Sequence, residues 1–354
     1  MNIVIAAGGT AGHINPGIAI AQELKKQNLN TKITFIGTDY GLEKELVPNA
    51  GFEIKLIHSR GLSRNVLKLA KSICYNLIGV KESYRILKDI DPDIVIGMGG
   101  YVCAPVLFVA KKFLHIPVFI HESNAIAGKT NKFIGRFADG VALGFEAAKK
   151  DFNNKNVIIT GNPVRKDFKN IEKSFNTGKK KIVIFGGSQG AKNINNAVVD
   201  LIMRNTDKYN IVYATGKKQY DIVIDKVGKV NSNIKILPYI ENMSKELENA
   251  DLVISRSGAL TVTELCTIGV PAILIPLATA AENHQEFNAK VMESVGACKI
   301  ILDKDCNANN IEKAIDEMLS KDAREISKKA KSVMKLNACE EIYNMVKPYL
   351  KEGK

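Results

Sequence analysis

The sequence predicts an α/β protein of two doubly wound domains, each built around a parallel sheet. Short apolar segments alternate with helical patterns along almost the whole chain, as they do where strands are buried on both faces. The same junction of apolar strand, glycine loop and helix occurs at residues 3–27 and again at residues 182–204. A length of 354 residues is enough for two domains with separate cores. Strands alternating with helices therefore predict two parallel sheets, each covered by helices.

The first half of the chain contains seven apolar segments of strand length. The first predicted helix has Asn15 as its N-cap and Pro16 as its first residue, since both residue types favour these positions. We expect strands at residues 3–7, 33–36, 54–57, 94–96, 118–120, 141–143 and 157–159, with helices near 16–27, 43–47, 65–89, 105–114 and 128–136.

The second half repeats this pattern after a polar, turn-rich segment at residues 162–178, which indicates a linker. The predicted domains are therefore residues 1–163 and 164–337. Ligands of open α/β sheets bind outside the carboxyl ends of the strands, so both glycine loops are expected to line a common cleft between the domains. We expect strands at residues 182–185, 211–214, 234–237, 252–254, 272–275 and 299–301, with helices near 191–204, 218–228, 243–249, 259–268, 283–294 and in the remaining chain.

Composition argues against several classes of protein. The net charge is +13, but the lysines are spread over the whole chain and tryptophan is absent, which disfavours nucleic acid as a partner. The six cysteines are scattered without a Cys-x-x-Cys motif, so neither a disulfide framework nor a zinc site is expected, and a reducing cytosol is the simplest location. The longest apolar region, residues 102–120, is interrupted by charged residues and proline, which argues against a membrane span.

The long helix near residues 65–89 has more apolar residues than one core-facing stripe needs. A second apolar face with flanking basic residues is typical of contact with an anionic membrane surface, although another helix could cover it instead. Periodicity cannot separate these two alternatives. The expected buried stripe is Val66, Ala70, Ile73, Leu77, Val80, Tyr84 and Leu87, and the second face is Leu67, Cys74, Tyr75 and Ile78 beside Arg64, Lys68, Lys71, Lys81 and Arg85.

The glycine loop at residues 8–13 predicts an anion site. Its strand–loop–helix setting exposes backbone N–H groups at a helix N-terminus, where the helix dipole favours a phosphate. The loop is not a dinucleotide fingerprint, because Thr10 stands where a glycine is required and no acidic residue lies about 20 residues further on. A near-copy at residues 186–191 strengthens the prediction of phosphate binding.

Further polar groups follow predicted strands at the same sheet edge. Residues 97–101 form a second glycine loop, and residues 121–124 read His-Glu-Ser-Asn. The amide of Asn124 can both donate to and accept from a sugar hydroxyl.

In the second half, residues 255–264 combine a glycine turn, a helix N-terminus and Glu264 one turn later. A carboxylate there can accept both hydroxyls of a ribose, which favours a sugar nucleotide as ligand. Metal ligation is not expected. The acidic pairs Asp91/Asp93 and Asp303/Asp305 fit turns or caps, so helix dipoles, hydroxyl groups and arginine would stabilise the charge of a leaving group.

Six ordered motifs resemble those of the MurG family, the UDP-N-acetylglucosamine:N-acetylmuramyl-(pentapeptide) pyrophosphoryl-undecaprenol N-acetylglucosamine transferases. The resemblance spans nearly the whole chain. It implies a GT-B fold of two Rossmann-like domains, with a last helix near residues 338–354 returning to the first domain. The motifs are residues 8–16, 99–101, 121–124, 161–165, 186–191 and 255–264.

The resemblance also implies a function in peptidoglycan synthesis. The expected enzyme is a hexosyltransferase that makes lipid II from UDP-GlcNAc and lipid I, peripherally bound at the cytoplasmic face of the cell membrane and without a cofactor. Roles in cell shape and cell division, and other cell-wall synthesis proteins as partners, follow from the same resemblance.

Position by position, the resemblance implies a donor site. Uracil would lie near the backbone of Ile240, and the ribose would bind Glu264. The diphosphate would lie near Ser188 and the helix that starts at Ala259. GlcNAc would lie beside Asn124 and Gln285. The acceptor diphosphate would lie on the glycine loops of the first domain. Ser123 stands where glutamine is common in the family, so no contact is assigned here to the side-chain amide of that glutamine. Ala11 stands where glycine is common, so position 11 needs no left-handed backbone. The full donor set is Thr10, Ala11, Gly12, Asn124, Arg165, Ser188, Ile240, Ala259, Leu260, Thr261, Val262, Thr263, Glu264 and Gln285.

An inverting, metal-independent transfer needs one catalytic base. His13 is the first candidate, because it stands at the loop where acceptor and donor should meet and an ordinary histidine pKa suits proton uptake. Glu122 and His121 are the alternatives. Two other functions stay open: a UDP-GlcNAc 2-epimerase, and a non-catalytic sugar-nucleotide-binding protein that docks on membranes.

Overall fold

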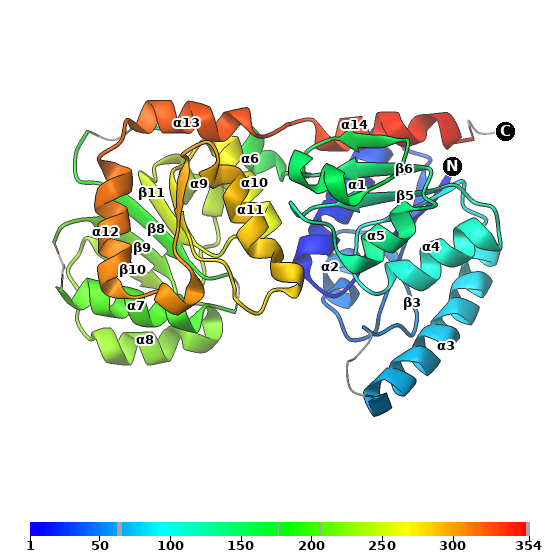
Figure 1. Cartoon of the computed structure of the whole chain (residues 1–354), viewed down its shortest axis with the longest axis horizontal. Helices are drawn as coiled ribbons and strands as arrows, with labels where there is room; N and C mark the ends of the chain where they lie inside the picture. The colour runs from blue at the N-terminus through cyan, green and yellow to red at the C-terminus, as the bar shows by residue number, and fades with distance from the viewer. Residues whose placement is uncertain (62–65, 176, 188, 205–206, 352–354) are drawn as a thin grey trace. The chain divides into compact units, whose positions relative to one another are not determined.

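The computed structural model describes residues 1–61, 66–175, 177–187, 189–204 and 207–351, apart from the side chains of residues 66–71 and 166. The chain forms two compact units (Figure 1). The first contains Met1–Val164 and Lys335–Lys354, and the second contains Arg165–Met334. Each unit has its own parallel sheet with helices packed on it, as the sequence predicts.

The first unit has a seven-stranded parallel sheet in the order β3-β2-β1-β4-β5-β6-β7. The strand order reverses direction between β1 and β4, and ligands of such sheets bind at the carboxyl ends of the strands on either side of this point. The strands are β1 (Asn2–Ala6), β2 (Lys32–Gly37), β3 (Glu53–Leu56), β4 (Ile94–Gly97), β5 (Val118–Glu122), β6 (Gly140–Leu143) and β7 (Val157–Ile159).

The first helix, α1 (Ala11–Gln27), begins earlier than predicted. Thr10, with an extended backbone, occupies the N-cap position, so the prediction of Asn15 as N-cap was wrong. Pro16 lies inside the helix, where the turn before it is already closed by hydrogen bonds from the N–H groups of His13 and Ile14 to the carbonyl of Thr10. A proline there removes one hydrogen bond of the ladder. The glycine loop is therefore shorter than expected, and residues 11–13 form the first turn of α1.

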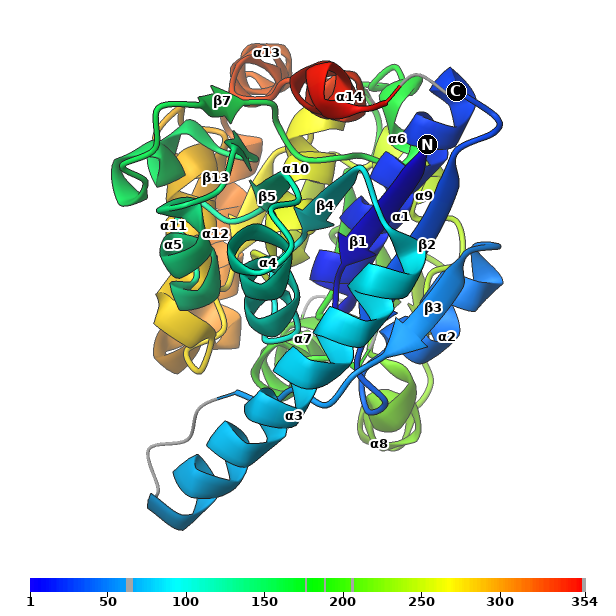
Figure 2. The same cartoon turned by 90° about the vertical axis from the view of Figure 1, so that its right-hand side faces the viewer.

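The end of the chain belongs to the first unit. Helix α14 (Ala338–Val346) packs on α1 (Figure 2). Its Ile342 and Met345 join the core that contains Ile3 and Phe35. The other helices of this unit are α2 (Glu43–Asn49), α3 (Val66–Ile90), α4 (Cys103–Lys112), α5 (Lys129–Gly135), η1 (Glu146–Asp151) and η5 (Lys347–Tyr349).

Helix α3 buries Leu87 of the predicted stripe, but the other buried residues of its described part differ from the prediction. Ser72, Gly79, Ser83 and Leu87 are buried, and these mostly small residues let the helix approach its neighbours closely. The N-terminal part of α3 projects beyond the sheet (Figure 2). Three residues expected in the buried stripe are exposed instead: Ile73 by 47%, Leu77 by 64% and Tyr84 by 39%.

The second unit has a six-stranded parallel sheet in the order β10-β9-β8-β11-β12-β13, with the reversal between β8 and β11. No helix of the described residues is long and apolar enough to span a membrane. The strands are β8 (Lys181–Phe185), β9 (Asn210–Ala214), β10 (Ile234–Leu237), β11 (Leu252–Ser255), β12 (Ala272–Leu274) and β13 (Cys298–Ile300). The helices are α6 (Lys166–Lys169), α7 (Lys192–Arg204), η2 (Lys217–Gln219), α8 (Tyr220–Val227), α9 (Met243–Glu248), α10 (Ala259–Ile268), η3 (Ala281–Asn283), α11 (His284–Glu293), η4 (Asp303–Asp305), α12 (Ala308–Leu319) and α13 (Ala323–Ser332).

Candidate functional site

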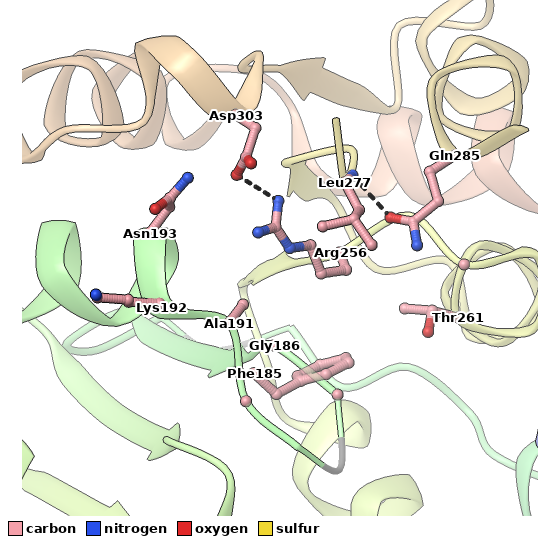
Figure 3. A pocket seen from close by; sticks show the side chains of 13 residues that line it. Phe185, Gly186, Ala191, Lys192, Asn193, Arg256, Thr261, Leu277, Gln285 and Asp303 are labelled. Atoms are coloured by element: carbon pink, nitrogen blue, oxygen red, sulfur yellow. Dashed lines mark hydrogen bonds and ion pairs between the residues drawn. The ribbon is translucent and has the colours of Figure 1, made fainter. Parts of the chain in front are cut away.

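A pocket of about 500 Å³ lies at the carboxyl edge of the second sheet, beside the strand-order reversal (Figure 3). Its walls are the glycine loop after β8, the loop after β11, the first turn of α10 and the start of α11. Of the predicted site residues, Thr261 and Gln285 line this pocket. Ser188, which the resemblance places in the glycine loop, lies outside the described residues.

Arg256 and Asp303 form an ion pair on the pocket wall, with side chains only 13% and 12% exposed (Figure 3). Nη1 of Arg256 lies 2.6 Å from Oδ1 of Asp303 and also donates to the carbonyl groups of Ile275 and Pro276. Neither residue was predicted from the sequence as a part of the site, and Asp303 was expected in a turn or cap. An arginine directly after a buried strand was the available signal, but its partner lies 47 residues away.

Helix α10 directs its N-terminus toward the pocket. The first N–H groups of a helix have no partner within it and attract anions, and Thr261 of this turn lines the pocket. Val262 and Thr263 are fully buried, and the Thr263 hydroxyl donates to the carbonyl of Ala259 at 2.8 Å. These two predicted site residues therefore hold the helix in place, whereas Leu260 and Thr261 are partly exposed.

Glu264 faces Arg165 one turn further along α10. Oε1 of Glu264 lies 3.5 Å from Nε of Arg165, and the carboxylate side chain is 22% exposed. Burial raises the pKa of Glu264 to about 7, against the opposing effect of the arginine. The Arg165 guanidinium also stacks on the ring of Phe168 at 4.5 Å. Glu264 can thus change its charge close to neutral pH.

Two further predicted residues have mainly structural contacts. Oε1 of Gln285 accepts a hydrogen bond from the N–H of Leu277 at 3.0 Å. The backbone carbonyl of Gln285 accepts one from the Ser257 hydroxyl at 2.8 Å. These bonds tie α11 to the loop after β11. The side chain of Ile240, after β10, is buried in the second unit, so only its backbone is available to a ligand.

In the first unit, a buried carboxylate organises the glycine loop at residues 8–13. The N–H of Gly9, which has a positive φ of 89°, donates to Oε2 of Glu43 at 2.9 Å. Oε1 of Glu43 accepts from the N–H and the hydroxyl of Thr38 at 2.8 and 2.6 Å. Because Gly9 is turned toward this carboxylate, an anion would be bound by the first turn of α1 rather than by the whole loop. Ala11 has the helical backbone expected there.

His13 connects the two glycine loops of the first unit. Its ring is half-buried, with Nδ1 3.3 Å from the carbonyl oxygen of Gly8. A side chain at Gly99 would come within 2.9 Å of the His13 ring, so this ring packs directly on the loop after β4. His13 therefore lies at the carboxyl ends of β1 and β4, at the strand-order reversal.

His121 and Glu122 are buried and already bonded within the unit. Nε2 of His121 lies 3.3 Å from the carbonyl of Gly161, and burial lowers the pKa of His121 to about 4. The Glu122 carboxylate accepts four hydrogen bonds, two from Asn124, one from Gly128 and one from Asn131. Both geometries favour positioning roles over proton transfer.

Ser123 is also turned inward. Its hydroxyl lies 3.3 Å from Nδ1 of His121, so it is engaged with this buried ring. Among the described residues, no three histidine, cysteine, aspartate or glutamate side chains gather in a group that could hold a metal ion.

Two family models match the chain. The glycosyltransferase family 28 N-terminal domain matches residues 3–143, and the glycosyltransferase family 28 C-terminal domain matches residues 181–345. The second segment contains the whole six-stranded sheet, and the first contains the seven-stranded sheet apart from Asn2 of β1 and all of β7.

Relatives match over nearly the full length. A protein of Acetivibrio thermocellus, named UDP-N-acetylglucosamine--N-acetylmuramyl-(pentapeptide) pyrophosphoryl-undecaprenol N-acetylglucosamine transferase, is 46% identical over 99% of this chain and 99% of its own. The crystal structure of MurG from Acinetobacter baumannii has a TM-score of 0.81 at 29% identity, covering 98% of this chain and 99% of that chain. UDP-GlcNAc 2-epimerase from Neisseria meningitidis has a TM-score of 0.66 at 15% identity, covering 98% of this chain and 100% of that chain, which shows a shared fold alone. The chain therefore belongs to glycosyltransferase family 28 and, within it, to the MurG family.

Proposed function

We propose that this protein transfers GlcNAc from UDP-GlcNAc to the muramyl 4-hydroxyl of lipid I, an undecaprenyl-diphosphate-linked sugar peptide, and so makes lipid II for peptidoglycan. The observation that carries the proposal is the 46% identity, over the full length of both chains, to a transferase named for this reaction. The pocket at the N-terminus of α10 supports it, because a sugar nucleotide needs a site for two phosphates.

The second unit is the proposed donor domain. The diphosphate would bind the N–H groups of the first turn of α10 and the Thr261 hydroxyl, and the ribose would donate to Glu264. Arg256, held in place by Asp303, lines the same pocket and would donate hydrogen bonds to the departing UDP from the N–H groups that Asp303 leaves free, while Asp303 offsets its charge. In this proposal uracil lies near the backbone of Ile240, and Gln285 and Asn124 contact GlcNAc.

The first unit is the proposed acceptor domain, with His13 as the base. Of the three candidates, His13 is the least buried, whereas His121 and Glu122 are engaged in hydrogen bonds inside the fold. The proton of the muramyl 4-hydroxyl passes to the imidazole as the oxygen attacks the anomeric carbon and the bond to UDP breaks. We expect His13→Ala to lower kcat at least 100-fold with lipid I, as loss of a general base does. An unchanged kcat would place the base elsewhere.

One assay separates the three candidate functions. The protein is incubated with labelled UDP-GlcNAc, with and without a lipid I analogue, and the labelled product is identified. A transferase moves the label to the lipid, a 2-epimerase forms UDP-ManNAc without any lipid, and a binding protein leaves UDP-GlcNAc unchanged. Label on the lipid is expected, and either other result would overturn the proposal.

We also propose that α3 contacts the anionic cytoplasmic face of the cell membrane. Ile73, Leu77 and Ile78 are 47–64% exposed, and the cations Lys81 and Arg85 lie exposed on the same helix. We call these three apolar residues the apolar strip. No described part of the chain covers it. Leu67, Lys68 and Lys71, which the sequence analysis assigned to the membrane face, have side chains outside the described residues, as has Arg64.

Sedimentation with vesicles tests this contact. Leu77→Glu combined with Ile78→Glu is expected to abolish binding to vesicles that contain acidic lipids, because two charges would enter the apolar interface. The control is Leu29→Glu with Leu336→Glu, which replaces two exposed leucines away from α3 and should bind like the wild type. Equal binding of all three proteins would refute the contact.

A further inference from the structure

Tyrosine rings gather at Arg60 and the adjoining Gly61 in the first unit. We call Tyr40, Arg60, Tyr75 and Tyr101 the Arg60 cluster. The guanidinium carbon of Arg60 lies 4.4 Å from the ring centroid of Tyr75 and 6.0 Å from that of Tyr40, and both distances are typical of cation–π contacts. In the described part of the chain no carboxylate forms an ion pair with this guanidinium. The sequence analysis did not single out this arginine.

The loop that carries Arg60 is held firmly against α3. The Asn76 side chain accepts hydrogen bonds from the Ser59 hydroxyl and the Arg60 N–H, and donates to the Arg60 carbonyl at 2.9 Å. Glu82 accepts from the N–H of His58 at 2.7 Å. Gly79 permits this contact, because a Cβ there would collide with the His58 carbonyl oxygen. The backbone of Arg60 is therefore ordered before any ligand arrives.

The Arg60 cluster lies between the glycine loops and the apolar strip. Tyr101 belongs to the glycine loop after β4, and its ring lies so close to Gly61 that no side chain fits there. Tyr40 follows β2, and its hydroxyl donates to the Ser59 carbonyl at 2.6 Å. Tyr75 lies on α3, three residues before Ile78 of the apolar strip. Tyr40 and Tyr101 are 55% and 59% exposed, so the cluster is open to a ligand.

An arginine stacked on aromatic rings keeps its N–H edge available for two parallel hydrogen bonds to an anion. Phosphate and carboxylate oxygens fit this edge, and a guanidinium already held by rings loses little freedom on binding. The acceptor of the proposed function has a diphosphate that joins the membrane-embedded prenyl chain to the sugar. Its path from the apolar strip to the glycine loops passes the Arg60 cluster.

We propose that Arg60 binds the diphosphate of the lipid acceptor, with Tyr40 and Tyr75 holding the guanidinium in place. The identity of the acceptor rests on the proposed function, whereas the anion site rests on the Arg60 cluster itself. The site is additional to the first turn of α1, which offers N–H groups but no positive side chain of comparable rigidity.

Kinetics with two acceptor analogues test the proposal. In both analogues the acceptor sugar is joined to a short prenyl chain. The link is a diphosphate in one analogue and a monophosphate in the other. Arg60→Ala should raise KM for the diphosphate acceptor about 10- to 100-fold, as expected for loss of a charge-assisted, bidentate contact. It should leave KM for UDP-GlcNAc unchanged and alter KM for the monophosphate acceptor much less. Arg60→Lys should give an intermediate KM, and Lys44→Ala, which removes an exposed cation from α2, should behave as wild type.

Direct binding keeps this test separate from the proposed function. The affinity of a prenyl diphosphate is measured without donor for wild type and Arg60→Ala, and wild type is expected to bind at least 10-fold more tightly. Equal affinities refute the site, whether or not the protein makes lipid II. Equal effects of Arg60→Ala on both acceptors would assign Arg60 to another group, such as a peptide carboxylate. Reduced binding of Arg60→Ala to acidic vesicles without acceptor would assign it to lipid headgroups, and both results overturn the proposal.

Discussion

The ionisation of Glu264 makes a quantitative prediction about donor binding. Its carboxylate is 22% exposed beside Arg165, and burial raises its pKa to about 7. Only the ionised carboxylate can accept hydrogen bonds from both ribose hydroxyls. Protonation therefore competes with the donor, and affinity for UDP-GlcNAc should fall as the pH drops through 7.

The size of this effect follows from the pKa. With a pKa of about 7 in the free protein, about 10% of Glu264 is protonated at pH 8 and about 90% at pH 6, so Kd should rise about tenfold between these values. That factor corresponds to about 1.4 kcal/mol of binding free energy. Calorimetry with UDP-GlcNAc between pH 5.5 and 8.5 measures it, because each phosphate of this ligand carries one ester and one anhydride linkage and has no second ionisation in this range.

Two variants decide whether Glu264 causes the slope. Glu264→Gln should bind more weakly at pH 8 and show no pH dependence around pH 7. Glu286→Gln is the control, because hydrogen bonds from Lys290 and Asn283 lower the pKa of Glu286 and keep it ionised throughout. A flat profile for the wild type, or an unchanged slope in Glu264→Gln, would refute the reasoning.

Three further predictions concern the first unit. Glu43→Gln leaves at least one of the three donors around it without an acceptor, so thermal unfolding should show a loss of about 1–3 kcal/mol, and an unchanged Tm would contradict its role. Glu122→Gln replaces one of the two carboxylate oxygens, so either both bonds from Asn124 or those from Gly128 and Asn131 lose their acceptor, and KM for UDP-GlcNAc should rise about tenfold or more, while a change in kcat alone would point to proton transfer. Ile342→Ala deletes a buried side chain of α14 and should cost about 2–5 kcal/mol in urea unfolding, whereas a cost below about 0.5 kcal/mol would mean that α14 is not part of this core.

Several elements of the fold could be predicted because they depend on short stretches of sequence. A strand buried on both faces must be apolar, so the central strands β1, β4, β5, β8 and β11 appear as apolar runs, whereas the edge strand β3 contains Glu53 and Lys55 and is largely exposed. The start of α10 at Ala259 was also predicted correctly, since a glycine turn after a strand marks it. The start of α1 was not, because Pro16 is tolerated within the helix once the turn before it has formed.

Contacts between distant residues could not be predicted in the same way. The bond from Gly9 to Glu43 spans 34 residues, and the pair of Arg256 with Asp303 spans 47. The buried face of α3 was also decided by contacts with distant residues. Gly79 packs against the carbonyl of His58, and this orientation of the helix turns Leu77 outward. Periodicity alone favoured the larger side chains as the buried ones.

The sequence by itself determined the fold class, the matching glycine loops at residues 8–13 and 186–191, and the six family motifs. Each of these depends on residues that are close together in the chain. The tertiary structure alone decided which charged groups are buried and what they contact. Burial lowers the pKa of His121 and raises that of Glu264, so one is neutral inside the fold while the other titrates near pH 7. Burial is a property of the packed chain, since it depends on every element that excludes water from a side chain.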